Sequence, residues 1–333
     1  MAEEVLKLNN IVKYFPVFER GIITRKKVGD VHAVDGISLG IQKGETLGLV
    51  GESGCGKTTA GKVILDLIPK DSGEVLFEGK EVHTTLTNGS KEEARYLRRN
   101  MQMVFQNPYG SLDPRMTVFD IIAEAFTVHK HVPETEWTDR VYSLLRLVGL
   151  EEYHAERYPH EFSGGQRQRI SIARSLATDP KFIIADEPVS SLDVSVRAQI
   201  LALLQTLQKN ESISFLYISH DLSSVRQISQ HVAVMYLGKI MEYAPADIIF
   251  ARPLNPYTIA LLSAVPVPDP ERKTARLILP GDVPSPINPP SGCRFNPRCP
   301  YATQLCKDSE PSLREIEPGH LVACHYAENF LKK

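Results

Sequence analysis

The sequence is poor in tryptophan, in cysteine and in any excess of charge. Its 333 residues include one Trp and five Cys, and 38 Lys and Arg oppose 40 Asp and Glu for a net charge of −2. Because the charges nearly balance, the protein has no overall positive field, and nucleic acid is not expected as an electrostatic partner. Hydrophobic residues still make up 42%, enough for one large domain with a smaller appendage.

Long apolar runs are also missing. No run approaches the roughly 18 residues that cross a bilayer, and the opening MAEEVLKLNN is acidic and lacks the apolar core of a signal peptide. We therefore expect a chain that is made in the cytoplasm and stays there. Thiols are reduced in that compartment, so clustered cysteines indicate metal or redox chemistry before structural disulfides.

The order of apolar patterns predicts a parallel α/β sheet. Residues 4–50 alternate short apolar runs with turns and read as strands, followed by a helix over about 57–67 and a hairpin strand at 72–82. Apolar residues at helical spacing over about 114–150 predict a helical insertion. Helix and strand patterns then alternate as SGGQRQRISIARSLA, FIIAD, VSVRAQILALLQTLQK and SFLYIS.

The composition changes beyond Pro253, where proline is frequent and periodicity is weak. We expect a main domain over 1–250, with a helical subdomain at about 107–165. Residues 251–333 are expected to form a linker and a small, loop-rich, cysteine-containing extension. The prolines of this region are Pro266, Pro268, Pro270, Pro280, Pro284, Pro286, Pro289 and Pro290.

GESGCGKT, at 51–58, matches the phosphate-loop pattern G-x-x-x-x-G-K-[ST]. It lies between a buried strand and a helix, which disfavours the alternative of a glycine-rich turn without a ligand. The glycines let backbone N–H groups surround phosphates, the lysine supplies a charge, and the first threonine can ligate Mg²⁺. The predicted nucleotide contacts are Gly51, Ser53, Gly54, Cys55, Gly56, Lys57, Thr58 and Thr59.

Acidic and polar side chains follow the later strands. In FIIADEP, Asp186 is placed to hold Mg²⁺ and Glu187 to act as general base for a water molecule, although a solvated acidic turn would look similar. His220 closes FLYISH and is expected to act as a sensor of the γ-phosphate or in the transition state. Gln106, closing MVFQ, is expected to reach the metal or the attacking water.

FSGGQRQR, at 162–169, resembles the signature motif of ABC-transporter ATP-binding subunits. GESGCGKT, Gln106, SGGQ, ADEP, SSLD and His220 follow the order of that family, and the resemblance covers about residues 4–245. It implies a P-loop NTPase with a RecA-like core, an antiparallel β subdomain and a helical subdomain. It also implies an active ATPase that uses ATP and Mg²⁺.

The resemblance also implies roles in a head-to-tail dimer. Ser163 and Gly165 open a helix whose N-terminus would face the γ-phosphate bound by the partner subunit. Asp193, in SSLD, would lie across the same interface. Phe15, in IVKYFP, best matches the position that stacks on adenine, with Tyr14 as the alternative; either side chain could instead be part of the core.

NPYGSLDPRMTV and the C-terminal CRFNPRCPYATQLCKDSEP look like the oligopeptide/dipeptide uptake branch, and the N-terminal region resembles its F-type subunit. The implied partners are a homologous D-type ATP-binding subunit, two transmembrane permeases and an extracytoplasmic peptide-binding protein. The implied location is the cytoplasmic face of the membrane. A nickel importer of the same architecture, or a soluble ABC ATPase, remains an alternative.

Four of the five cysteines lie in the last 41 residues. They could bind zinc, hold an iron–sulfur cluster or form two disulfides, with His320 or His325 close enough to replace one thiolate. Structural zinc sites usually contain C-x₂₋₄-C pairs, whereas wide spacing on proline-rich loops suits a Cys₄ cubane. The resemblance supports [4Fe–4S], ahead of zinc and then free thiols. The proposed ligands are Cys293, Cys299, Cys306 and Cys324.

Overall fold

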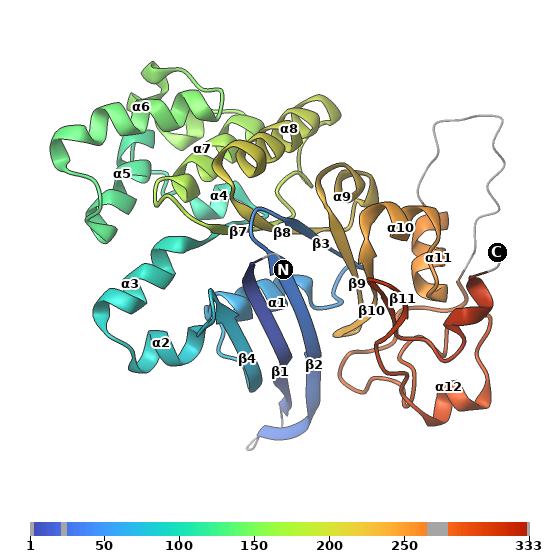
Figure 1. The fold of residues 1–333 in the computed structure, drawn as a ribbon. Helices are drawn as coiled ribbons and strands as arrows, with labels where there is room; N and C mark the ends of the chain where they lie inside the picture. The colour runs from blue at the N-terminus through green and yellow to red at the C-terminus, as the bar shows by residue number, and fades with distance from the viewer. Residues whose placement is uncertain (1–2, 21–24, 265–278, 332–333) are drawn as a thin grey trace, which may run out of the picture. The chain divides into compact units, whose positions relative to one another are not determined.

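The structure, a computed structural model, describes residues 3–20, 25–264 and 279–331 (Figure 1). Three prolines of the predicted linker, Pro266, Pro268 and Pro270, lie outside the described residues. The chain forms two compact units. The helical unit comprises Met1–Leu6, Ile41–Thr46 and Leu76–Ile218, and the phosphate-loop unit comprises Lys7–Gly40, Leu47–Val75 and Ser219–Lys333. The predicted domain boundary at residue 250 stays a prediction.

Three parallel strands form the sheet of the helical unit, in the order β8-β7-β6. They are β6 (Met101–Val104), β7 (Phe182–Asp186) and β8 (Ser214–Ser219). Every residue of β7 and β8 is buried, as expected for apolar strands covered on both faces. Register pairs Val104 with Ala185, so the residues that follow β6 and β7 emerge at the same edge of the sheet.

The predicted helical insertion is present as α5 (Val118–His129) and α6 (Trp137–Leu147), which contact each other and α7 (Gly164–Leu176) (Figure 1). Thr117 and Ser163 cap α5 and α7 by accepting a backbone N–H of the first turn. In chain order the unit contains β5 (Lys80–Glu81), α2 (Val82–Asn88), α3 (Lys91–Asn100), α4 (Pro108–Ser111), α5 (Val118–His129), η1 (Glu134–Glu136), α6 (Trp137–Leu147), η2 (Glu152–Glu156), η3 (Pro159–Glu161), α7 (Gly164–Leu176) and α8 (Val194–Glu211).

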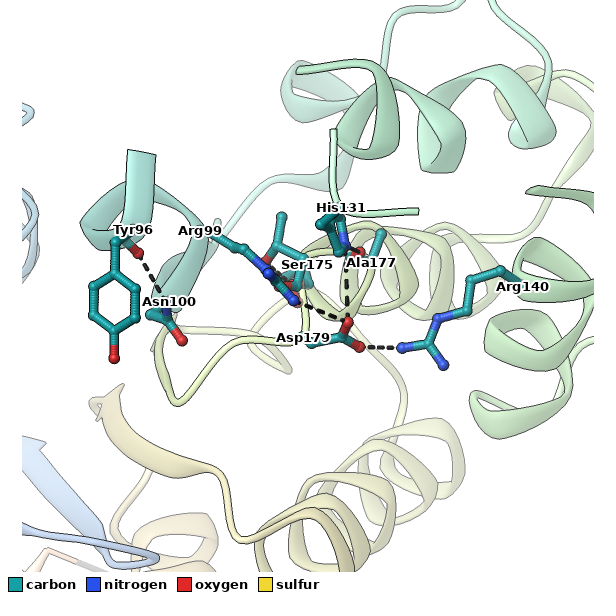
Figure 2. Close-up of polar contacts among 9 residues, drawn as sticks. Tyr96, Arg99, Asn100, His131, Arg140, Ser175, Ala177 and Asp179 are labelled. Carbon is teal, nitrogen blue, oxygen red and sulfur yellow. Dashed lines mark hydrogen bonds and ion pairs between the residues drawn. The ribbon is translucent and has the colours of Figure 1, made fainter. Parts of the chain in front are cut away.

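One carboxylate joins several of these helices. Asp179, in the turn between α7 and β7, forms ion pairs with Arg99 of α3 at 3.4 Å and with Arg140 of α6 (Figure 2). His131, just after α5, lies 3.7 Å from the same carboxylate. The Nε2 of His131 also lies 3.0 Å from the carbonyl oxygen of Ala177, and burial lowers the pKa of the ring. The cluster fixes the helical insertion to the turn that leads into β7.

The phosphate-loop unit contains two groups of strands. One group, ordered β2-β1-β4, consists of β1 (Glu4–Arg20), β2 (Arg25–Gln42) and β4 (Ser72–Phe77). The other, ordered β11-β12-β10-β9-β3, consists of β3 (Thr46–Val50), β9 (His231–Tyr236), β10 (Lys239–Pro245), β11 (Arg314–Glu317) and β12 (His320–Val322). Strands β3 and β9 are parallel, with Val50 opposite Val234. The helices are α1 (Lys57–Ile64), α9 (Leu222–Ile228), α10 (Ala246–Ala251), α11 (Pro256–Ser263), α12 (Gln304–Asp308) and η4 (Ala327–Phe330).

The C-terminal tail is loop-rich, as expected, but it also extends a sheet. Strand β12 pairs antiparallel with β10 and carries β11 as the edge strand. Buried Glu242 of β10 accepts hydrogen bonds from the backbone N–H groups of Leu254 and Asn255 and pairs with His320 at 2.7 Å. Because a buried carboxylate needs such partners, this cluster fixes the tail to β10.

Among the described residues, none of the helices is long and apolar enough to span a membrane.

Candidate functional site

The phosphate loop lies between β3 and α1, as predicted. Gly56 is the N-cap of α1 and has no side chain to occupy the first N–H groups of the helix. Those groups therefore point toward the loop and favour an anion. Ser53 is exposed, while Thr58 and Thr59 are half-buried in the first turn of α1. The backbone of this segment can thus surround phosphate oxygens.

Lys57 is buried and folds back over the loop. Its Nζ donates to the carbonyl oxygens of Gly51 at 2.8 Å and Glu52 at 3.0 Å, and lies 3.7 Å from Cys55 Sγ. Burial raises the pKa of the Cys55 thiol. The ammonium group of Lys57 is held where the loop can present it to a phosphate.

The structure brings Gln106 and Glu187 together at the end of the β6-β7 pair. Gln106 Nε2 donates to Glu187 Oε2 at 2.8 Å. Glu187 adopts a left-handed backbone conformation with φ 46°, which is strained for a residue with a side chain and is typical of functional sites. Its N–H donates to the carbonyl oxygen of Ile218 at 2.9 Å, and this bond helps to hold the carboxylate at the sheet edge.

Asp186 ends β7 and is 2% exposed. A carboxylate at this depth must have hydrogen-bond partners or a cation. His220 directly follows β8 and is exposed. Asp186 belongs to the helical unit and His220 to the phosphate-loop unit, and their predicted roles stay predictions.

The signature segment opens α7 as predicted. Ser163 and Gln166 form a reciprocal capping box, in which the Ser163 hydroxyl accepts from the Gln166 N–H. A Cβ on buried Gly165 would lie 2.4 Å from Val196 Cγ1, so this glycine permits close packing of α7 on α8. Asp193 caps α8 by accepting from the Val196 N–H at 2.9 Å, and this bond lowers the pKa of its carboxyl group.

The two aromatic residues of β1 have different surroundings. Tyr14 donates its hydroxyl to Asp35 Oδ1 at 2.6 Å, and its ring packs on His32. Burial and this hydrogen bond raise the pKa of Tyr14 to about 12. Phe15 is half-buried, with Lys13 Nζ 5.4 Å from its ring centroid. The predicted stacking of Phe15, or of Tyr14, on adenine stays a prediction.

Glu52, in the phosphate loop, makes contacts that the sequence does not predict. Its N–H donates to the hydroxyl of Tyr257 at 2.9 Å, and its carboxylate pairs with Arg298 at 2.7 Å. Both partners lie more than 200 positions further along the chain, where no motif connects them to the loop. Neither residue is a sequence candidate for the nucleotide site.

The four C-terminal cysteines line one small cavity of about 20 Å³, together with Phe295, His325 and other residues of the tail. All five cysteines are free thiols, so the disulfide alternative does not describe this structure. Burial raises the pKa of Cys293 to about 12 and that of Cys324 to about 11. Both shifts come from the burial of these thiols in the tail.

The two nearby histidines are used differently. His320 pairs with Glu242, and His325 lies 2.9 Å from the carbonyl oxygen of Ser309 through Nε2. His325 also lines the thiol cavity, whereas His320 is not among its lining residues. Within the described ranges, no three Cys, His, Asp or Glu side chains meet around a point suited to one metal ion.

A glycine-rich turn between a buried parallel strand and a helix, with its lysine held over the turn, defines a phosphate-loop nucleotide-binding protein. Comparison with known proteins narrows this class. The ABC transporter family profile matches residues 34–190, and the profile of the oligopeptide/dipeptide transporter C-terminal region matches residues 241–306. The signature helix lies within the first profile, and Cys293, Cys299 and Cys306 lie within the second, which ends before Cys324.

Relatives cover nearly the whole chain. The oligopeptide transport ATP-binding protein AppF of Bacillus subtilis (strain 168) is 51% identical over 97% of each chain. OppF of the same organism is 48% identical over 98% of each. The chain therefore belongs to the ATP-binding subunits of ABC transporters, in the oligopeptide/dipeptide branch, and is an ATPase subunit.

Solved structures agree with this assignment. The dimeric ATP-binding cassette MJ0796, in a post-hydrolysis state with ADP and Pi, is 26% identical, has a TM-score of 0.62 and covers 72% of this chain and 98% of its own. The cassette cbiO1 of Clostridium perfringens, part of an ABC transporter complex, is 27% identical with a TM-score of 0.61 over 75% of this chain and 91% of its own. The predicted P-loop NTPase fold is confirmed.

Proposed function

We propose that this chain binds MgATP and couples its hydrolysis to the uptake of di- and oligopeptides through an ABC importer. The observation that carries this proposal is the likeness to oligopeptide transport ATP-binding proteins along nearly the whole chain, tail included. The tail is important here because the cassette alone is shared by transporters of many cargoes. A nickel importer or a soluble ABC ATPase is the alternative.

The phosphate-loop residues would bind the nucleotide. Backbone N–H groups of the loop and of the first turn of α1 would surround the phosphates, with Lys57 neutralising charge. Thr58, Asp186 and Gln106 are the residues proposed to hold Mg²⁺, which when bound neutralises the charge that develops on the phosphates. Phe15 would stack on the adenine.

Glu187 is proposed as the general base. Its carboxylate is oriented by the hydrogen bond from Gln106, and it would take a proton from the water that attacks the γ-phosphate. His220 would stabilise charge on the transferred group. Ser163, Gly165 and Asp193 would act on the nucleotide bound by a partner subunit, across a head-to-tail dimer.

The proposed assembly contains a homologous D-type ATP-binding subunit, two transmembrane permeases and an extracytoplasmic peptide-binding protein. This chain would lie at the cytoplasmic face of the membrane. Its relatives carry names that specify oligopeptide transport, and uptake of a cargo that the ATPase does not contact requires such partners. ATP binding would close the dimer, and hydrolysis would reopen it.

The assembly can be tested by co-expressing the chain with its permeases and binding protein and reconstituting them in proteoliposomes. We expect ATP-dependent accumulation of a labelled oligopeptide, and no accumulation with a Lys57→Ala chain, which lacks the ammonium group that would meet the phosphates. Accumulation of Ni²⁺ and not of peptide would support the nickel alternative. ATP hydrolysis without association with any permease would support a soluble ATPase and contradict the proposal.

We propose further that the four C-terminal cysteines hold a [4Fe–4S] cluster. They provide a set of four soft sulfur donors facing one cavity, the donor set that such clusters use. Zinc is the alternative ligand for the same donors. The cavity of about 20 Å³ is small, so the four side chains would have to spread on loading. The bound group would cross-link loops that build little core of their own.

Chain purified without oxygen tests this assignment. We expect iron and acid-labile sulfide together with broad visible absorbance, all lost in Cys306→Ser. Cys55→Ser should keep them because Cys55 lies in the phosphate loop and does not line the cavity. Zinc without iron would overturn the cluster and favour the alternative, and absence of both metals would contradict any metal centre.

A further inference from the structure

Arg298 connects the cysteine-bearing loop to the phosphate loop. Its Nη1 and Nη2 donate to the two carboxylate oxygens of Glu52 at 2.7 and 3.1 Å. Arg298 is 8% exposed. A bidentate guanidinium–carboxylate pair fixes orientation as well as distance. The Arg298 side chain is 9% exposed and that of Glu52 is 26% exposed, so water screens this pair less than it screens a surface ion pair.

An aromatic cluster supports the same contact. Phe295 packs against Tyr236 of β9 and Tyr257 of α11, with ring centroids 5.5 and 5.3 Å away. The Tyr257 hydroxyl accepts from the Glu52 N–H at 2.9 Å. Glu52 is thus held twice, through its backbone by Tyr257 and through its side chain by Arg298.

Arg294, one position before Phe295, makes a second set of arginine contacts. Its Nη1 donates to the carbonyl oxygen of Leu237 at 2.7 Å, and its Nη2 pairs with Asp35. The other oxygen of Asp35 accepts from the hydroxyl of Tyr14. Tyr14 precedes Phe15 in β1, so Arg294 reaches the strand that carries the proposed adenine contact.

We propose that the loop from Cys293 to Cys299 is a positioning element for the nucleotide site. Arg298 acts through Glu52 on the phosphate loop, and Arg294 acts through Asp35 and Tyr14 on the strand that carries Phe15. Neither arginine needs to touch ATP. The two arginines restrict the phosphate loop and the Phe15 strand to one arrangement. Phe295, which lies between the arginines in the sequence, is buried in the aromatic cluster.

The physical effect of this restriction is on binding. If the contacts are broken, the loops sample other arrangements, and the apparent dissociation constant rises by the inverse of the competent fraction. Once ATP has ordered the loops, chemistry at Glu187 proceeds as before. Loss of Arg298 is therefore expected to raise the KM for ATP and to change kcat little.

Arg298→Gln in the full chain tests this expectation. We expect the dissociation constant for MgATP to rise about tenfold, while kcat at saturating ATP stays within about twofold. Arg298→Lys keeps the charge but loses the bidentate geometry, so it should restore part of the affinity. Glu52→Gln should resemble Arg298→Gln. Combining the two should weaken binding less than the sum of the single changes, because both remove one contact.

Arg252→Gln is the matched control. Arg252 also forms an arginine–glutamate contact to the tail, with Glu317 at 2.6 Å, but its partner is in β11 and not in the phosphate loop. MgATP affinity should be unchanged. Equal affinity in wild type and a folded Arg298→Gln chain, or equal loss in Arg252→Gln, would overturn the positioning role. The inference rests on ATP being the nucleotide of this site; failure of the wild type to bind MgATP would instead refute the proposed function.

Discussion

Replacing Glu187 with Gln is expected to lower ATP hydrolysis about 100- to 1,000-fold while leaving ATP binding intact. The amide is nearly isosteric with the carboxylate, but it does not accept a proton from water at neutral pH. The phosphate loop and Lys57 are unchanged, so the nucleotide still binds. ATP that binds without turning over should hold two ATP-binding subunits together, and size-exclusion chromatography with MgATP should show a persistent dimer.

Glu134→Gln is a matched control for this result. Glu134 is an exposed glutamate in η1 of the same unit, and its replacement removes the same charge without touching the β7 edge. Its hydrolysis rate should equal that of the wild type. Hydrolysis at the wild-type rate in Glu187→Gln would exclude Glu187 as the base, and dissociated subunits in MgATP would exclude the trapped dimer.

The contact between Gln106 and Glu187 shows how far local sequence patterns reach. Each residue follows an apolar strand pattern, and parallel strands end at the same edge of a sheet, so proximity is predictable. With Val104 opposite Ala185, Gln106 and Glu187 lie close enough for the amide of Gln106 to donate a hydrogen bond to the carboxylate of Glu187. Register depends on side-chain packing across strands, and no single strand pattern encodes it.

Local sequence patterns do not predict the contacts of Arg298 and Tyr257 to Glu52. Arg298 lies 246 positions from Glu52, and an arginine between two cysteines is compatible with many roles. The pairing of β12 with β10 is equally non-local, since three residues of HLV give too short a pattern to define a strand. The buried carboxylate of Glu242 and its partners Asn255 and His320 determine where the tail docks, and polar residues carry no periodic signal.

The phosphate loop offers a second experiment with a large expected effect, the substitution Gly56→Ala. Gly56 has φ 110°, and a Cβ there would lie 1.9 Å from the carbonyl oxygen of Ala33 and 2.7 Å from Met235 Cε. Backbone strain and overlap together should cost about 2–4 kcal/mol. Either the loop moves and MgATP affinity falls about 100-fold or more, or the loop stays and the free energy of unfolding decreases. Calorimetric titration and urea denaturation of the same sample measure both.

Gly54→Ala separates the effect of backbone strain from the effect of steric overlap, because it introduces the strain without the overlap. Gly54 also has a positive φ, 79°, but a Cβ there has nothing within 4 Å. It should therefore cost only backbone strain, about 1 kcal/mol, and weaken MgATP several-fold. If Gly54→Ala and Gly56→Ala weaken binding equally, the approach of β2 at Ala33 does not shape the loop. If only Gly56→Ala loses the nucleotide, close packing of the loop against the Ala33 carbonyl and the Met235 side chain is required for phosphate binding. The first turn of α1 must then approach strands β2 and β9 closely before it can hold a phosphate.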